Sequence, residues 1–412
     1  MKKTLVALVV ATAAASASAT TVYNNEGTTV DVGGRLDVVL GKFNDNERAD
    51  LRNNESRIEF KAQHDLGNGL KALAFTRLRF NEGGDRWDTQ SSFNNIKTNK
   101  LWLGFEAENI GRLTFGKQDT NGDAIQINDN AYIFGGNNNV LDGGDKVLSF
   151  RSADFQVAEG QKLGFGADYV FGQSAKDGNQ ATTAKLDANG NEVKDANGKT
   201  VMVQDGSKLK YGYNAVAFYQ ADFGDLKAKL NAGYTVAKYD DDSATNVTGS
   251  QEKAWRVASQ FAYGATEFGV EYGETKFVDT KAHENQGKGK FLEVAAKYEY
   301  LKDTASVYTA WEHNVYKGDK GGLSFGKSEA NFLRSVAGGL AVGNGGKLTE
   351  NVFILGTDYK FTSNVVTYAE YAYSHVKANT KASIGGAGVT KYADGTAKAK
   401  DHRYGVGVRV YF

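Results

Sequence analysis

Cysteine and proline are both absent from this sequence, and no long apolar run follows its first twenty residues. An exported protein without cysteine has no disulfides, which excludes a small disulfide-stapled secreted domain. Proline would remove a backbone donor from a β-ladder, so its absence suits long strands in which each N–H group is bonded. No window approaches about 18 consecutive apolar residues, which excludes a transmembrane helix.

An excess of one charge is also missing. Lys plus Arg and Asp plus Glu both number 49, so the formal net charge is zero, and a nucleic-acid partner is not expected. The five histidines are scattered without the spacing of a metal site or an evident nucleophile partner. We therefore predict no metal, no other cofactor and no enzymatic activity.

The first residues read MKKTLVALVVATAAASASA: two lysines, a short apolar stretch and a small-residue cleavage site. This order predicts a cleaved signal peptide over residues 1–19 and a mature chain that forms a single domain over residues 20–412. An uncleaved N-terminal anchor is the alternative, although the apolar stretch is too short to span a bilayer.

The sequence is rich in glycine (49), phenylalanine (23) and tyrosine (21), and from Thr29 onward its apolar residues alternate with polar ones. Alternation with a period of two predicts β-strands. About 16 are expected, near residues 29–42, 54–65, 69–81, 97–107, 111–118, 146–153, 161–172, 208–223, 226–239, 253–263, 266–278, 291–300, 304–317, 351–361, 365–376 and 402–412. The predicted fold class is therefore all-β.

Short and long connections alternate along the chain. Tight polar turns are expected at residues 66–69, 223–226, 263–266, 301–303 and 362–364, whereas the connections between them are long and rich in Gly, Asn, Asp, Ser and Lys. An even number of antiparallel strands, with short turns at one rim and long loops at the other, is typical of a transmembrane β-barrel of the outer membrane.

Each predicted strand has one apolar and one charged face. In the first, Leu36 and Leu40 alternate with Arg35 and Asp37. Two observations favour an apolar exterior: aromatic residues flank the short turns, as in an interfacial girdle (Phe223, Tyr263, Tyr300 and Phe361), and a closed sheet of about 16 strands is too wide for side chains to fill. The charged face is therefore expected to line a water-filled lumen.

The connection over residues 119–145, here named the constriction loop, contains apolar residues that a solvated loop has little reason to carry. Folding into the barrel would give Ile133 and Phe134 a wall to pack against and would place Asp123 and Asp129 in the lumen. A loop packed on top of the barrel is the alternative that these residues leave open.

Several stretches together resemble the general diffusion porins of Gram-negative outer membranes. They are VYNNEG at 22–27, GRLD at 34–37, SRIEFKA at 56–62, FGG at 134–136, SFRSADF at 149–155 and the terminal Phe412. The resemblance covers essentially the whole mature chain. It implies a trimer of 16-stranded barrels whose third external loop folds inward to narrow the pore.

The resemblance also implies a set of pore-lining residues. Basic residues of the wall correspond to Arg35, Arg57, Lys100 and Arg151, and the loop acid that faces them corresponds to Asp129. The other candidate residues of the constriction loop are Asp123, Ile133, Phe134, Gly135 and Gly136. Arg77 also points inward, where the family more often has an acid, and Arg79 and Arg112 are interpreted as solvated wall. Tyr132 and Ile133 replace the usual Pro-Glu before FGG, so we predict weak ion selectivity tilted to anions.

The expected function is a general porin of the Gram-negative outer membrane that admits small hydrophilic solutes and ions by passive diffusion. A substrate-specific porin for sugars or anions is the alternative, and an outer-membrane protease or lipase is a third class. Expected partners are outer-membrane lipid and lipopolysaccharide, two further copies in a homotrimer, and the assembly machinery, for which Phe412 resembles the signal.

Overall fold

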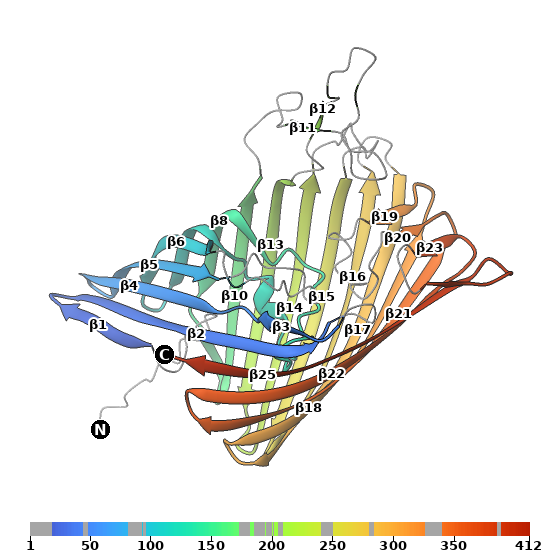
Figure 1. The fold of residues 1–412 in the computed structure, drawn as a ribbon. Coiled ribbons are helices and arrows are strands. Elements are labelled where there is room, and N and C mark those ends of the chain that lie inside the picture. The colour runs from blue at the N-terminus through green and yellow to red at the C-terminus, as the bar shows by residue number, and fades with distance from the viewer. Residues whose placement is uncertain are drawn as a thin grey trace.

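Sixteen antiparallel strands wind once around an axis and close on themselves in the computed structural model (Figure 1). In chain order they are β2 (Thr28–Lys42), β4 (Arg57–Gly67), β5 (Leu70–Arg79), β6 (Lys97–Ala107), β7 (Gly111–Asp119), β8 (Gly143–Ser152), β10 (Gln161–Phe171), β13 (Leu209–Asp222), β14 (Leu226–Tyr239), β15 (Ser250–Tyr263), β16 (Thr266–Asp279), β17 (Glu284–Leu301), β18 (Ala305–Gly318), β21 (Lys347–Thr362), β22 (Val365–Ala378) and β25 (Ala397–Tyr411). The predicted fold class is confirmed.

Shorter elements extend these strands or lie in the loops. They are β1 (Thr20–Asn25), β3 (Asp50–Asn53), β9 (Phe155–Ala158), β11 (Thr182–Ala184), β12 (Met202–Gln204), β19 (Leu323–Phe325), β20 (Leu340–Val342), β23 (Ala382–Ile384), β24 (Thr390–Lys391) and the 3-10 helix η1 (Asp123–Ile125). The structure describes residues 19–43, 48–80, 93, 96–172, 182–184, 194, 200, 202–204, 209–239, 250–279, 284–325, 340–384 and 389–412. Nearly all of the expected signal peptide lies outside these ranges. Within them, no helix is long and apolar enough to cross a bilayer.

The first and last barrel strands form the seam. Strand β25 pairs with residues 35–42 of β2, and the chain terminus adds two backbone hydrogen bonds, from Gly34 N to Phe412 O (2.9 Å) and from Phe412 N to Gly34 O (3.2 Å). A Cβ atom on Gly34 would lie 2.7 Å from the Phe412 ring, so glycine makes room for that ring. The terminal strand therefore has no free edge at the seam.

The two faces of the sheet differ in polarity as the alternation of residues predicts. Leu36 and Leu40 on β2 are more than half exposed on the outside of the barrel, whereas Arg35 and Asp37 are buried within it. The aromatic residues next to the short turns, Phe223, Tyr263, Tyr300 and Phe361, are all exposed as well. An outer surface of apolar residues bounded by aromatics suits lipid, and the polar inner surface suits water.

Several strands begin earlier than the alternation predicts. Strands β17, β21 and β25 begin at Glu284, Lys347 and Ala397, four to seven residues before the predicted starts at 291, 351 and 402. These extensions are rich in lysine and glycine, and their outer face carries charge. Because they rise beyond the apolar band, hydrophobic alternation does not mark them.

Three apolar clusters lie inside the barrel. One, at the mouth, joins inward residues such as Phe291 and Tyr316 to Leu323 and Val342 of a small sheet, β19–β20–β23. The other two contain residues of the constriction loop. This loop therefore folds into the lumen, as one of the two sequence-based alternatives predicted.

Candidate functional site

The constriction loop crosses the lumen from β7 and is held by three carboxylates of the barrel wall. Near its start, Asp168 of β10 accepts hydrogen bonds from the backbone N and the side-chain amide of Asn121, both at 2.8 Å. Further along, Glu271 of β16 accepts the backbone N–H groups of Ile127 and Asn128, both at 2.9 Å. Each carboxylate satisfies backbone donors that a non-repetitive loop would otherwise leave without a partner.

The third carboxylate, Glu370 of β22, holds the tip of the loop. It accepts the backbone N–H groups of Tyr132, Ile133 (2.9 Å) and Phe134 (3.0 Å), and the hydroxyl of Tyr308 (2.6 Å). Strand β22 lies far from the loop in sequence, yet it is the second strand from the seam. The tip is therefore fixed to the side of the barrel opposite the point where the loop begins.

Apolar contacts complete the docking of the loop tip. Ile133 and Phe134 are buried against inward residues that include Val39, Val352 and Ile354. These wall positions are apolar although their neighbours in the lumen are charged, because the loop covers them. Burying two such side chains contributes about 3–6 kcal/mol, which adds to the hydrogen bonds of Glu370.

The local backbone geometry requires glycine at both glycine positions of the FGG sequence. A Cβ atom on Gly135 would lie 1.7 Å from the Asp129 carboxylate, and Gly136 adopts a φ of +90°, a value that disfavours L-amino acids with side chains. The loop therefore turns sharply at its tip, with Asp129 folded against the turn. Asp129 also accepts the backbone N–H of Ala131 (3.1 Å).

The expected wall residues lie on strands β2 to β8 and form a continuous basic surface. Glu55, held in a bulge between β3 and β4 with a φ of +63°, contacts Arg35 (2.8 Å), Arg79 (3.2 Å) and Arg57 (4.0 Å). Glu59 then joins Arg57 (2.8 Å) to Arg77 (2.6 Å). We call these arginines, together with Lys100, Arg112 and Arg151, the basic wall.

A pocket between the basic wall and the constriction loop is lined by charged residues of both. Its lining includes Arg77, Lys100, Arg112 and Arg151 on the wall and Asp119 and Asp123 on the loop side. Lys100 forms an ion pair with Asp119, and Arg151 lies over the Phe218 ring, 3.2 Å from its centroid. The loop acid that faces these basic residues is therefore Asp123.

The pKa of the Asp123 carboxyl group is raised above its ordinary value. Asp123 is exposed to the lumen and lines the pocket between the loop and the wall. This enclosure, followed by the negative charge of Asp142, raises the pKa of Asp123 to about 6, although Lys100 opposes the shift. The charge of the pocket therefore changes just below neutral pH.

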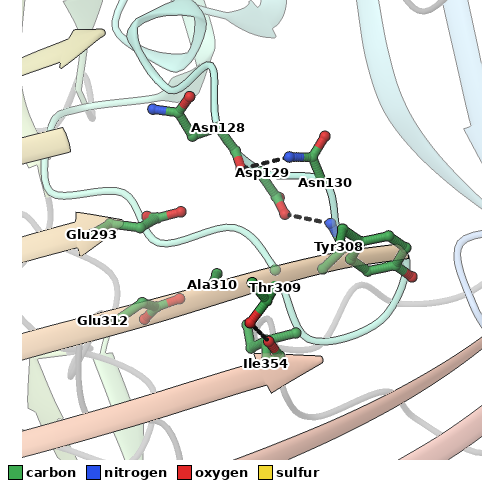
Figure 2. A pocket seen from close by; sticks show the side chains of 11 residues that line it. Asn128, Asp129, Asn130, Glu293, Tyr308, Thr309, Ala310, Glu312 and Ile354 are labelled. Carbon is green, nitrogen blue, oxygen red and sulfur yellow. Dashed lines mark hydrogen bonds between the residues drawn. The ribbon is translucent and has the colours of Figure 1, made fainter. Parts of the chain in front are cut away.

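Asp129, the expected partner of the basic wall, lines a different pocket (Figure 2). This pocket lies between the loop and strands β17 and β18, where Glu293 and Glu312 approach Asp129. Its surroundings are thus acidic on the wall side. The structure brings Arg35, Arg57, Arg77, Lys100 and Arg151 to one wall but separates them from Asp129.

Sequence reasoning missed several residues of the site. Arg79, interpreted as solvated wall, shares Glu55 with Arg35 and Arg57. Arg409 of β25 pairs with Asp37 (2.6 Å) and lies over the Tyr132 ring of the loop, 4.7 Å from its centroid. The alternation of residues along β25 indicates that Arg409 points into the barrel. Its contact with the loop depends on how β25 and β2 are aligned at the seam, which the alternation does not give.

Charge therefore divides the lumen into two sides. The acidic side, on β16 to β22, carries Glu271, Glu293, Glu312 and Glu370, and the constriction loop runs along it. The basic wall lies on the other side. Within the described residues, no group of His, Cys, Asp and Glu could hold a metal ion. The arrangement can create an electric field across the passage and bind or repel ions by charge.

Comparisons with known proteins agree with this architecture. The family model of the Gram-negative porins matches residues 4–379. A major outer membrane protein of Pasteurella multocida strain Pm70 is 34% identical over 429 residues, covering 100% of both chains, and another from Pasteurella multocida is 36% identical, covering 77% of this chain and 86% of its own. These matches show the family directly.

Solved structures of outer-membrane proteins share the fold at low sequence identity. OmpT of Vibrio cholerae aligns with a TM-score of 0.60 at 16% identity, covering 95% of this chain and 99% of its own. Salmonella typhi OmpF, in complex with daunomycin, gives 0.56 at 15% identity with the same coverage. An anion-selective porin from Comamonas acidovorans gives 0.51 at 14% identity, covering 93% and 100%. The chain belongs to the Gram-negative porin family and forms a channel in the outer membrane.

Proposed function

We propose that this channel is a general diffusion pore for small hydrophilic solutes and ions, narrowed by the constriction loop and lined on one side by the basic wall. The observation that carries the proposal is the docking of the loop through Asp168, Glu271 and Glu370. A loop fixed at three points narrows the lumen, which suits a pore that selects solutes by size. No bond chemistry is required of such a site.

The same docking supports weak selectivity tilted to anions. Glu271 and Glu370 are buried beneath the loop, where both accept backbone N–H groups and Glu271 also forms an ion pair with the buried Arg256. Lys100, Arg112 and Arg151 of the basic wall are instead only partly buried and line a pocket that remains accessible to solvent. Fixed charges across a narrow lumen order water and align dipolar solutes, so apolar molecules lose favourable hydration when they enter.

A substrate-specific pore would need aromatic side chains exposed along the lumen for stacking on sugars. Tyr308 and Tyr368 point inward, but each is only 2% exposed because it packs around Tyr132 of the loop. These two tyrosines therefore hold the loop in place and do not form an exposed row of aromatic side chains that could bind sugars. This favours general diffusion over sugar specificity.

Two measurements test the proposal. Liposome swelling with sugars of graded size should show a rate that falls smoothly with size, and a single preferred sugar would overturn general diffusion. Reversal potentials across a salt gradient should be small with the sign of anion preference. Neutralising Arg77 and Lys100 together to Gln should move the potential towards cation preference, whereas strong cation preference in the unmodified channel would contradict the proposal.

The membership of the porin family and the outer-membrane location suggest which partners the chain has. We infer a homotrimer, since one of the solved structures that share the fold is a trimer form of an outer membrane protein, OmpT of Vibrio cholerae. Contacts with lipopolysaccharide and with the assembly machinery are part of the same proposal. The position of Phe412 at the seam, bonded to Gly34, supports a role for the terminal residue in barrel closure.

A further inference from the structure

Arg112, interpreted from the sequence as solvated wall, lines the pocket between the basic wall and the constriction loop. It lies next to the start of β7, on the periplasmic side of the loop, and stands directly opposite Arg151 of β8 in the strand register. Like charges directly opposite each other destabilise a sheet, so two neighbouring arginines on the inner wall require an explanation.

The other two basic residues of the pocket already have acidic partners. Arg77 pairs with Glu59 at 2.6 Å, and Lys100 pairs with Asp119 of the loop side. Their charges are therefore balanced within the protein, and a bound anion would have to compete with these carboxylates.

Neither Arg112 nor Arg151 forms an ion pair with any residue that the structure describes. Glu106 stands between Lys71 and Arg112 in the register, yet it pairs with neither among these residues. Asp123, which lines the same pocket and also lacks an ion pair there, offsets one of the two arginine charges. The pocket is left with an excess of about one positive charge, which suits a monoanion.

Aromatic side chains form another part of the pocket lining. Phe75 of β5 and Trp102 of β6 stack inside the barrel, with their ring centroids 5.5 Å apart and an angle of 25° between the rings. Phe75 is buried, whereas Trp102 is only partly buried. Gly116 stands directly opposite Trp102 on β7 and adds no side chain beside the indole. The pocket therefore offers an apolar aromatic surface next to its positive charge.

Arg112 connects the two kinds of surface, because its guanidinium lies over the Trp102 ring, 5.8 Å from the ring centroid. A guanidinium binds a carboxylate through two parallel hydrogen bonds, and an indole favours contact with another planar ring. A solute whose carboxylate meets Arg112 would thus bring its remaining atoms close to Trp102. Charge alone would attract any anion, and the indole alone would attract any apolar solute.

We propose that this pocket binds monocarboxylates that carry an aromatic ring, of which benzoate is a simple example. Arg112 binds the carboxylate, Arg151 adds a second positive charge, and Trp102 contacts the ring. The inference rests on the proposed pore function and adds a solute class to it. One partly buried indole is a single site and not a row of aromatics, so other solutes still pass according to size.

The test records single-channel currents of the full-length mature protein in planar bilayers at neutral pH, where benzoate is ionised. Benzoate should reduce the current in a saturable manner. Acetate lacks the ring and benzyl alcohol lacks the charge, so each should need a concentration at least about tenfold higher for the same reduction. Equal effects of benzoate and either of these solutes overturn the proposal, as does the absence of any saturable effect of benzoate.

Two variants separate the roles of charge and ring. Arg112→Gln should raise the half-blocking concentration of benzoate about tenfold or more, because it removes a charge-assisted contact. Trp102→Leu should raise it about two- to tenfold and should leave the weak effect of acetate unchanged. Arg112→Lys should give an intermediate value, because lysine keeps the charge without the planar pair of donors.

Matched controls remove the same groups from other places. Lys162→Gln removes a positive charge from the inner wall near the start of β10, outside the pocket lining, and Trp311→Leu removes an indole from the outer face of β18. Both should keep the half-blocking concentration of the unmodified channel. Undiminished block by benzoate in Arg112→Gln or in Trp102→Leu overturns the proposal.

Heat-modifiable gel mobility shows whether each variant folds, and the comparison of the three solutes on the unmodified channel needs no variant. Liposome swelling with sugars tests the pore function separately. A rate of swelling that falls smoothly with sugar size, without block by benzoate, refutes this site alone. A single preferred sugar refutes general diffusion instead.

Discussion

Replacing Glu370 with Gln should loosen the constriction loop without changing the volume of the side chain. One carboxylate oxygen of Glu370 accepts from Ile133 N and Phe134 N, and the other from Tyr132 N and the Tyr308 hydroxyl. Whichever way the Gln amide is turned, its NH2 group meets two donors. The Tyr308 hydroxyl can turn to accept from that amide, but a backbone N–H cannot, so at least one backbone donor of the loop tip loses its acceptor.

The magnitude follows from the contacts that remain. A hydrogen bond to a charged group contributes about 1.5–3 kcal/mol, and removing one partner of a buried charged network costs about 3–5 kcal/mol. The buried side chains of Ile133 and Phe134 still contribute about 3–6 kcal/mol to docking. The tip should thus stay docked most of the time, but a loss of about 3 kcal/mol raises the undocked population about a hundredfold.

Single-channel recording in planar bilayers measures this change. We expect Glu370→Gln to show greater open-channel noise, more frequent brief closures and a broader spread of conductance. Glu106→Gln is the control, because Glu106 lies on the inner wall near the periplasmic end of β6 and forms no hydrogen bond with the constriction loop, all of whose residues are described. A Glu370→Gln channel as quiet as the unmodified one would refute the idea that this carboxylate holds the loop.

Three further changes test other parts of the structure. Lowering the pH from 7.5 to 5 should protonate Asp123, whose pKa is raised to about 6, and shift reversal potentials towards anions; Asp123→Asn should abolish that step. Gly136→Ala, at a φ of +90°, should destabilise the loop tip by about 1–2 kcal/mol and increase channel noise. Deleting Phe412 should lower the amount of folded barrel at the cell surface, measured by heat-modifiable gel mobility, and normal levels would contradict a role in assembly.

The strands and their facing could be predicted from the sequence because the membrane imposes a simple rule. A side chain that meets lipid must be apolar, so the alternation of Leu36 and Leu40 with Arg35 and Asp37 fixes both the strand and its orientation. The rule fails where strands leave the membrane, which is why the lysine-rich start of β17 was predicted seven residues too late.

The partners of the loop could not be predicted, because they are separated by long stretches of sequence. Glu370 lies 236 residues or more from the backbone donors that it binds, and Glu271 lies 143 or more from its own. The alternation of residues along the strands shows that both acids point into the barrel, but many other acids of the chain also point inward. Only the closure of the barrel decides which of them meets the loop and which faces water.

Bulges limit sequence reasoning in a second way. The chain between β3 and β4 contains a residue with positive φ, Glu55, within a segment that alternation treats as one regular strand. That irregularity turns the Glu55 carboxylate towards Arg35 and Arg79. Arg79 was therefore interpreted as solvated wall, although it shares a carboxylate with the predicted residues.

The constriction loop couples its own docking to the charge of the passage. In this chain Tyr132 and Ile133 stand where the family usually has Pro-Glu, and Ile133 is buried against the wall, where a carboxylate would be costly. The substitution thus removes a negative charge from the loop and strengthens its anchor at once. The basic wall then faces two acids of the loop, Asp119, which pairs with Lys100, and Asp123, whose pKa is raised to about 6, so the field of the passage should change with pH.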